Sequence, residues 1–192
     1  MERLKIAHVP YSLMLEGTKP YSLCENFLSE GTELVPAWKV FHSRMMNDED
    51  TDFSHLLRCC DYLGIPDVRA SLNKMLVLDY IIANEDRHYT NFGFIRSAET
   101  LKWYGTAPIF DSVTSLWHNA LDTVEPRKCQ PFAKTHEEQI KLVSDLRFFN
   151  IEALEGIEQE IITIFSKSHI INENRSKAIA KAVLDRATNI DI

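Results

Sequence analysis

The fold is decided by residues 81–91, which read Ile81-Ile82-Ala83-Asn84-Glu85-Asp86-Arg87-His88-Tyr89-Thr90-Asn91. A second stretch completes them further along the chain and reads Ala107-Pro108-Ile109-Phe110-Asp111-Ser112. The polar part of the first stretch follows a long apolar segment, and Asp111 comes directly after an apolar run. Asp86 and Asn91 lie five residues apart, and Asp111 follows Asp86 by 25 residues. We therefore predict that these three side chains act at one site.

The combination of Asp86, Asn91 and Asp111 suits phosphoryl transfer. That reaction needs a carboxylate to orient or deprotonate the attacking hydroxyl, and it needs oxygen ligands to hold Mg²⁺ against nucleotide phosphates. We predict that Asp86 is the base and that Asn91 and Asp111 bind the metal. Each residue alone also has a structural interpretation, because loops use Asn and Asp as caps and turn formers. The three together favour the functional interpretation.

Two further side chains in the loop have alternative roles. His88 lies two residues after Asp86, where it can donate a hydrogen bond that holds the loop or can steer the proton. We place His88 in the catalytic group with Asp86 and expect loop support to be its main role. Arg87 can pair with a carboxylate or a phosphate, or it can remain exposed to solvent.

Apolar periodicity and breaker residues predict the elements around this loop. Two strands within residues 6–28, joined by a turn at 16–20, are expected to open the chain. A helix is predicted from residue 33 to about 45, a second over 52–62 and a buried central helix over 68–83. A hairpin with strands at 92–95 and 101–104 follows, and the run at 107–110 leads into Asp111. Three more helices are expected near residues 135–147, 151–167 and 173–188.

Composition narrows the class of protein. The chain has 192 residues, of which 45% are hydrophobic and 26% charged, so it fits one globular domain or two small lobes. Its formal charge of −7 argues against direct binding of nucleic acid. Cys59 and Cys60 lie in a helical pattern, so we expect buried thiols rather than metal ligands. No signal peptide or membrane span is expected, and a cytoplasmic location follows.

The two quoted stretches resemble the HipA-like serine/threonine kinases, the bacterial toxin kinases of toxin–antitoxin systems. The similarity extends to His8-Val9-Pro10-Tyr11 and to Pro20-Tyr21-Ser22-Leu23-Cys24-Glu25-Asn26-Phe27, which look like strands leading into that family's inter-lobe hinge. The resemblance implies an α+β, protein-kinase-like fold, with a mainly helical large lobe preceded by the last strands of a small lobe. Residues 1–30 would be the remnant of the small lobe and the hinge, and residues 31–192 the large lobe.

The same resemblance implies ATP and Mg²⁺ as cofactors and a protein Ser/Thr hydroxyl as the acceptor. The adenine would lie against backbone groups near Glu25, Asn26 and Phe27. Asp86 would be the catalytic base, and Asn91 and Asp111 would bind Mg²⁺.

Two features depart from the family's pattern. Many relatives carry Gly two residues after the second metal-binding Asp, where this chain has Val113, a β-branched residue that resists positive φ. Gly17 is the only glycine before Gly31, so neither a Gly-rich phosphate loop nor a strand Lys precedes the hinge. We therefore expect the chain to begin inside the small lobe, to be nearly inert alone, and to need a partner or further segment that supplies these parts.

Two alternatives stay open at this point. The chain can be a non-catalytic interaction module of a toxin–antitoxin complex, with an antitoxin as its partner. It can also be a kinase that acts on a lipid or small-molecule hydroxyl, because phosphoinositide kinases carry a similar Asp-Arg-His-x-x-Asn string. The lack of a basic membrane-facing cluster weighs against a lipid acceptor, and we expect no membrane partner.

Overall fold

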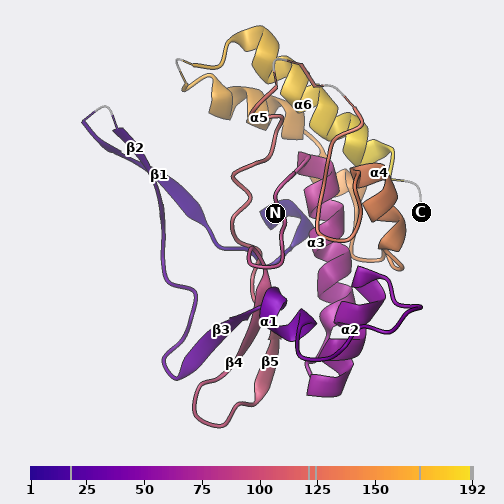
Figure 1. The fold of residues 1–192 in the computed structure, drawn as a ribbon. Coiled ribbons are helices and arrows are strands. Elements are labelled where there is room, and N and C mark those ends of the chain that lie inside the picture. Colours follow the sequence, from indigo (N-terminus) through magenta and orange to yellow (C-terminus); the bar gives the residue numbers. More distant parts are fainter. Residues whose placement is uncertain (18, 121, 124, 169, 191–192) are drawn as a thin grey trace.

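The computed structural model describes residues 1–17, 19–120, 122–123, 125–168 and 170–190. Figure 1 shows helix α3 in the middle of the molecule, with α5 and α6 packed together at one end and a small sheet beside its other end. In chain order, the elements are η1 (Glu2–Leu4), β1 (Tyr11–Glu16), β2 (Lys19–Cys24), β3 (Thr32–Pro36), α1 (Ala37–Phe41), α2 (Asp52–Leu63), α3 (Val68–Ile82), β4 (Gly93–Ser97), β5 (Trp103–Thr106), α4 (His136–Gln139), η2 (Ile140–Leu142), η3 (Ile151–Leu154), α5 (Ile157–Phe165) and α6 (Glu173–Thr188).

Helix α3 forms the centre of the hydrophobic core, as its nearly continuous apolar sequence predicts. Its side chains Leu72, Leu76 and Val77 are almost fully buried. The helix ends where Ala83 takes a left-handed conformation, with φ of 51°, and its N–H returns to the carbonyl of Tyr80. The polar loop of residues 84–91 therefore starts directly from the buried central helix.

The predicted hairpin after this loop is present as β4 and β5, and it belongs to a sheet of order β3-β4-β5. Strand β3 pairs antiparallel with β4, with Val35 opposite Phe94. The prediction of a helix from residue 33 was therefore wrong over residues 33–36, and only Ala37–Phe41 is helical. Pro36 explains the boundary, because proline lacks an N–H and is tolerated at the end of an edge strand or the start of a helix.

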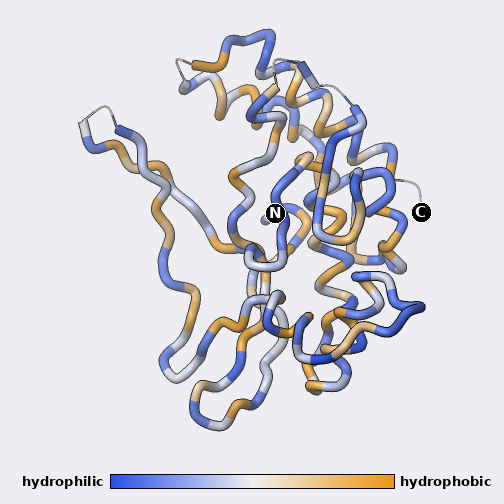
Figure 2. The backbone as a smooth tube through the Cα atoms, viewed as in Figure 1, coloured by the Kyte–Doolittle hydropathy of each residue, from blue (hydrophilic) through white to orange (hydrophobic). Residues whose placement is uncertain are grey.

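Strands β1 and β2 form the predicted hairpin, with Tyr11 opposite Cys24 and Glu16 opposite Lys19. The hairpin projects away from the body of the molecule (Figure 1) and carries hydrophobic residues along its strands (Figure 2). Leu13 and Leu15 are 74% and 64% exposed. A two-stranded ribbon alone is marginally stable in water, so we expect this hairpin to pack against another segment or chain.

Residues ahead of the hairpin pack on the body. Leu4 and Ile6 belong to the hydrophobic core, and Arg3 forms an ion pair of 2.7 Å with Glu160 of α5. The backbone of Val9 then donates to the carbonyl of Ile109, which places the two segments side by side. This pairing, an isolated parallel bridge between His8 and Ile109, holds the run before Asp111.

The C-terminal helices agree with the predicted positions, with shorter lengths in two of the three. Helix α6 matches its predicted range of 173–188. Helix α4 and η2 replace the helix near 135–147 and end at Leu142, while η3 and α5 divide the helix near 151–167. Gly156, with φ of 77°, separates η3 from α5.

The cysteines and the membrane prediction can also be compared with the structure. Cys59 and Cys60 are fully buried free thiols, as predicted, and burial raises the pKa of Cys60. None of the helices in the described ranges combines the length and apolar character that crossing a bilayer requires.

Candidate functional site

A buried ion pair lies behind the polar loop. Asp79, near the end of α3, and Arg87, in the loop, are both 0% exposed. The guanidinium of Arg87 binds both carboxylate oxygens of Asp79, from Nε and from Nη2, each at 2.9 Å. Burial by itself lowers the pKa of Arg87. The neighbouring charge of Asp79 and its hydrogen bonds together raise that pKa by more, so the pKa lies above its usual value. The loop is thus fixed to the core helix by a bidentate charged contact.

The same guanidinium connects the loop to the segment that carries Asp111. Its Nη1 donates to the backbone carbonyl of Asn91 at 2.9 Å and to that of Asp111 at 3.3 Å, and it also contacts the carbonyl of Phe110. Nη2 donates to the hydroxyl of Ser112 at 2.9 Å. One side chain therefore brings the two predicted metal ligands to the same place. The exposed, solvated alternative for Arg87 was wrong.

The side-chain amide of Asn91 is fixed through its nitrogen. Its Nδ2 donates to the backbone carbonyl of Asp86 at 2.8 Å, which leaves the amide oxygen Oδ1 for another partner. The Asp111 carboxylate accepts no hydrogen bond from any residue that the structure describes. An amide oxygen and a free carboxylate are ligands that Mg²⁺ accepts, with water and phosphate oxygens completing its shell. These residues fit a magnesium ion shared with a nucleotide.

The backbone at Asp111 also answers the question raised by Val113. Asp111 itself takes the left-handed conformation, with φ of 50°, whereas Val113 is not among the positive-φ residues of the described chain. The backbone N–H of Asp111 donates to the hydroxyl of Tyr11 at 3.4 Å. The turn after the metal-binding position is therefore made at Asp111, and the β-branched residue two positions later is not strained by it.

Asp86 and His88 face one another at the edge of this site. The distance from His88 Nε2 to Asp86 Oδ2 is 3.9 Å, and both side chains are 41% exposed. His88 Nδ1 accepts a hydrogen bond from the backbone N–H of Thr90 and lies 2.8 Å from its hydroxyl. The imidazole thus has one nitrogen engaged in holding the loop and the other directed at Asp86, and this geometry is compatible with both predicted roles.

The fold of this chain is similar to that of a solved kinase structure. In solved structures, the chain superimposes on a Helicobacter pylori proinflammatory kinase, CtkA, with a TM-score of 0.71, 18% sequence identity and coverage of 97% of this chain and 78% of that one. The chain shares this kinase fold. A curated sequence, the serine/threonine-protein kinase CtkA of Helicobacter pylori strain J99, is 29% identical over 107 residues.

The sequence match is partial. The matched region spans 53% of this chain and 33% of the length of the curated kinase. No protein-family model matches the chain. The kinase fold is therefore supported by structure over nearly the whole chain, and by sequence over about half of it.

The kinase fold brings the predicted hinge close to Asp111. Phe27 stacks on Phe110 with ring centroids 5.6 Å apart. Asn26 uses its side-chain oxygen to accept from the N–H of Leu28 at 3.1 Å, and Glu25 is exposed. A cavity of about 510 Å³ lies beside the Phe110 ring, lined by Val9, Tyr11, Ser22, Phe110 and Asp111, with others. The predicted hinge residues Glu25, Asn26 and Phe27 are not among the residues that line it.

Two functional residues were missed by the sequence analysis. Asp79 was counted only as part of an apolar helix, and Asn84 only as part of the quoted stretch. Asn84 donates to Asp79 at 2.9 Å, while its Oδ1 accepts from the N–H of Asp86 and from the hydroxyl of Thr114. A charged residue inside the apolar stretch of residues 75–82 was the available signal, since such residues are almost never buried unless paired.

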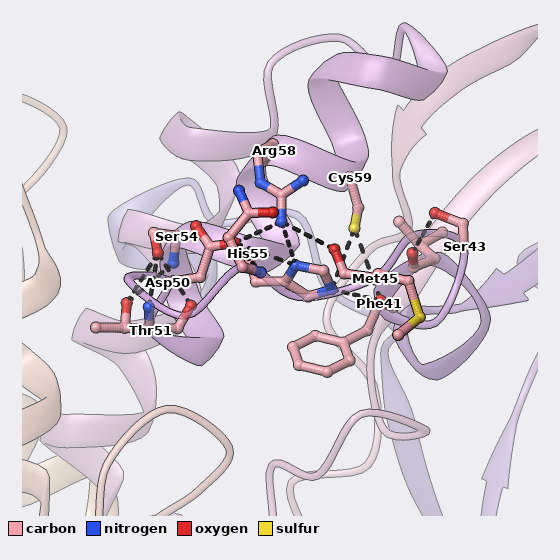
Figure 3. Close-up of polar contacts among 11 residues, drawn as sticks. Phe41, Ser43, Met45, Asp50, Thr51, Ser54, His55, Arg58 and Cys59 are labelled. Atoms are coloured by element: carbon pink, nitrogen blue, oxygen red, sulfur yellow. Dashed lines mark hydrogen bonds and ion pairs between the residues drawn. The ribbon is translucent and has the colours of Figure 1, made fainter.

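A second polar network joins α2 to the segment that follows α1 (Figure 3). His55 of α2 lies 2.8 Å from the carbonyl of Phe41 and 2.9 Å from Arg58, which in turn contacts Asp50. The ring of Phe41 lies 4.7 Å from that of Tyr89 in the loop. This network fixes the segment between α1 and α2, and through Phe41 it packs against the loop of residues 84–91.

Proposed function

We propose that this chain carries the base and metal-binding part of an ATP- and Mg²⁺-dependent protein kinase that phosphorylates Ser or Thr. One observation carries the proposal: Arg87 gathers the Asn91 and Asp111 segments around itself, next to Asp86, within a fold shared with a kinase. The matched relative is a serine/threonine-protein kinase, which supports a protein hydroxyl as the acceptor. The toxin–antitoxin context remains an expectation from the resemblance alone.

The residues divide the chemistry between them. Asp86 Oδ2 accepts the proton of the acceptor hydroxyl, whose oxygen forms a bond to the γ-phosphorus while the bond to the bridging oxygen of ADP breaks. Asn91 Oδ1 and the Asp111 carboxylate would hold Mg²⁺, which supplies positive charge to the phosphate oxygens. His88 keeps the loop in place from beside Asp86. The exposed fraction of Asp86 leaves room for a large acceptor.

The test is transfer of radiolabel from γ-labelled ATP to candidate proteins. It compares the chain alone with the chain plus a segment that supplies a Gly-rich loop and a strand Lys. We expect little transfer from the chain alone, because positioning of the phosphates is most of the catalysis. With the added segment, transfer should appear and should fall by about 10³-fold or more in Asp86→Ala and Asp111→Ala.

The matched control is Asp145→Ala, which changes an exposed aspartate paired only with its neighbour Arg147. It should transfer label at the wild-type rate. Undiminished transfer by the Asp86→Ala variant contradicts the mechanism. Transfer to lipid or small-molecule hydroxyls alone would keep the mechanism and overturn the substrate class.

The hairpin β1-β2 is our candidate surface for the partner. Its strands pair only with each other in the described part of the chain, and Leu13, Leu15 and Leu23 are mostly exposed. Further strands of a small lobe, on the same polypeptide or on a separate chain, would pair with its open edges and cover these side chains. The phosphate loop and Lys would come with them.

The same hairpin favours the second candidate function. A non-catalytic interaction module, with an antitoxin or another protein as its partner, would also need an exposed apolar surface. The two candidates differ at the site, because a binding module has no need of a free Asp111 carboxylate. If the completed protein binds its partner but Asp86→Ala and Asp111→Ala change nothing, the interaction module is correct.

A further inference from the structure

The carboxylate of Asp86 has a partner that comes from far along the sequence. Gln130 lies in the segment that leads into α4, and its Nε2 donates to Asp86 Oδ1 at 2.9 Å. The same nitrogen lies 3.4 Å from the backbone carbonyl of Glu85. One of the two oxygens of Asp86 is thereby engaged, and the other, Oδ2, is the one directed at His88.

Gln130 is itself held in place by a buried residue of α4. Gln139 is 2% exposed, its Nε2 donates to the carbonyl of Gln130 at 3.3 Å, and its Oε1 accepts from the N–H of Phe132 at 2.9 Å. Gln139 thus holds the backbone at Gln130 and at Phe132, two residues further on, and so restrains the chain that carries the Gln130 side chain. The buried Gln139 therefore helps to hold Gln130 where it can reach Asp86.

A charged contact holds the same segment onto the catalytic loop. Arg127 pairs with Glu85 at 2.7 Å, and both side chains are mostly buried, at 13% and 18% exposed. Asn119 accepts from Arg127 at 2.8 Å and reaches Glu85 at 3.3 Å. The contact between Gln130 and Asp86 is thus one of several between these segments, and it is the one that reaches a predicted reacting group.

The chemistry of the contact suits a base. A neutral amide donor fixes the carboxylate by a hydrogen bond without placing a positive charge beside it, whereas a Lys or Arg there would weaken its ability to take a proton. Fixing Oδ1 also selects which oxygen faces the acceptor. A base that is held in one rotamer loses less freedom when the transition state forms.

We propose that Gln130 is a positioning residue for Asp86, which holds Oδ1 so that Oδ2 faces the acceptor hydroxyl. The inference rests on the proposed function for the role of Asp86, but the contact itself can be tested without any activity. The test uses the full chain with ¹⁵N labelling and the variants Gln130→Ala and Gln130→Glu. Gln159→Ala, in an exposed position of α5, is the matched control.

The first arm follows resonances in the chain alone. The side-chain amide of Gln130 should shift in Asp86→Ala but not in Asp145→Ala. The imidazole resonances of His88 should shift in both Gln130 variants, because Asp86 is released beside them, and should stay unchanged in Gln159→Ala. An unchanged Gln130 amide in Asp86→Ala overturns the proposal, whatever the activity of the wild-type protein.

The second arm measures phosphate transfer by the completed protein. In Gln130→Ala, kcat should fall about tenfold, the equivalent of one lost hydrogen bond in the transition state, while KM for ATP stays the same. Gln130→Glu should lose more, because it sets a carboxylate against Asp86. A rise of KM for ATP with kcat unchanged overturns the positioning role. No transfer by the wild-type protein refutes the proposed function instead, and the first arm then still decides the contact.

Discussion

Arg87 connects helix α3, the polar loop and the segment of Asp111 through its hydrogen bonds. Its guanidinium pairs with Asp79 of α3 and binds the carbonyls of Asn91 and Asp111. The sequence alone left this arginine between a paired and an exposed role. The structure decides for the pair because Asp79, near the end of α3, is fully buried and both of its carboxylate oxygens accept hydrogen bonds from Arg87.

The buried pair predicts a large loss of stability when one partner is neutralised. Asp79→Asn keeps the shape of the side chain but leaves the Arg87 charge uncompensated in the core, so the free energy of unfolding should fall by about 3–5 kcal/mol. Urea unfolding followed by tryptophan fluorescence measures it. Asp145→Asn, which changes an exposed pair with Arg147, should alter stability little. Equal losses in the two variants would refute the central role of the buried pair.

His136 predicts how stability depends on pH. Burial, and then the charges of Arg186 and Arg127, lower the pKa of His136 to about 3, against 6.5 for a free histidine. Above pH 6.5 the residue is neutral in both states and has no effect. As the pH falls from 6.5 to 3, the unfolded chain takes up a proton that the folded chain refuses, so stability declines.

The measurement compares urea unfolding of the wild type and His136→Gln across this pH range. The variant should lack a decline of up to about 1.4 kcal/mol per pH unit that the wild type shows. His118→Gln, at an exposed position, is the control and should keep the wild-type decline. Parallel pH profiles for the wild type and His136→Gln would contradict the prediction.

At the scale of elements, the sequence predicts best where one pattern runs without competition. Helices α3 and α6 follow their patterns, because continuous burial and a clear amphipathic period leave one reading. The prediction of a helix from residue 33 was wrong because the apolar spacing there also fits a short strand. Pairing with β4 decided the outcome, and β4 begins at Gly93, 61 residues after β3 begins at Thr32. Such a partner cannot be read from the local sequence.

Gly93 is the residue that permits this pairing. A Cβ at Gly93 would lie 2.5 Å from the carbonyl oxygen of Val35 and 3.0 Å from the Cα of Pro36. Gly93→Ala should therefore separate β3 from β4 and lower the free energy of unfolding by about 1–3 kcal/mol. Hydrogen exchange should show lost protection in β3. Glu99→Ala, at an exposed position in the turn between β4 and β5, should leave β3 protected; unchanged protection in Gly93→Ala would contradict this role of Gly93.

At the scale of the whole molecule, the site lies where three distant parts of the sequence meet. The loop after α3 supplies Asp86 and Asn91, the segment beside residues 7–9 supplies Asp111, and the segment before α4 supplies Gln130. The motif predicted the first two because their spacing is short and their chemistry is specific. The third could not be predicted, since a lone glutamine in a loop has no pattern, and only packing against Gln139 directs it.

The hairpin β1-β2 and the segment of Asp111 meet at one cavity, because Tyr11, Ser22 and Asp111 all line it. Leu13 and Leu15 of the same hairpin are exposed. We propose that Asn91 and Asp111 hold one divalent cation together with the phosphates of ATP. This claim does not depend on the acceptor or on the partner.

The most direct test replaces Mg²⁺ with paramagnetic Mn²⁺ and records ¹⁵N spectra of the full chain with ATP. Broadening should centre on the side-chain amide of Asn91 and on the backbone amides next to Asp111, because a nearby Mn²⁺ relaxes them. It should disappear from these signals in Asp111→Ala and persist in Asp145→Ala. Broadening centred elsewhere, or broadening at Asn91 that survives Asp111→Ala, would contradict the shared metal site and with it the proposed kinase chemistry.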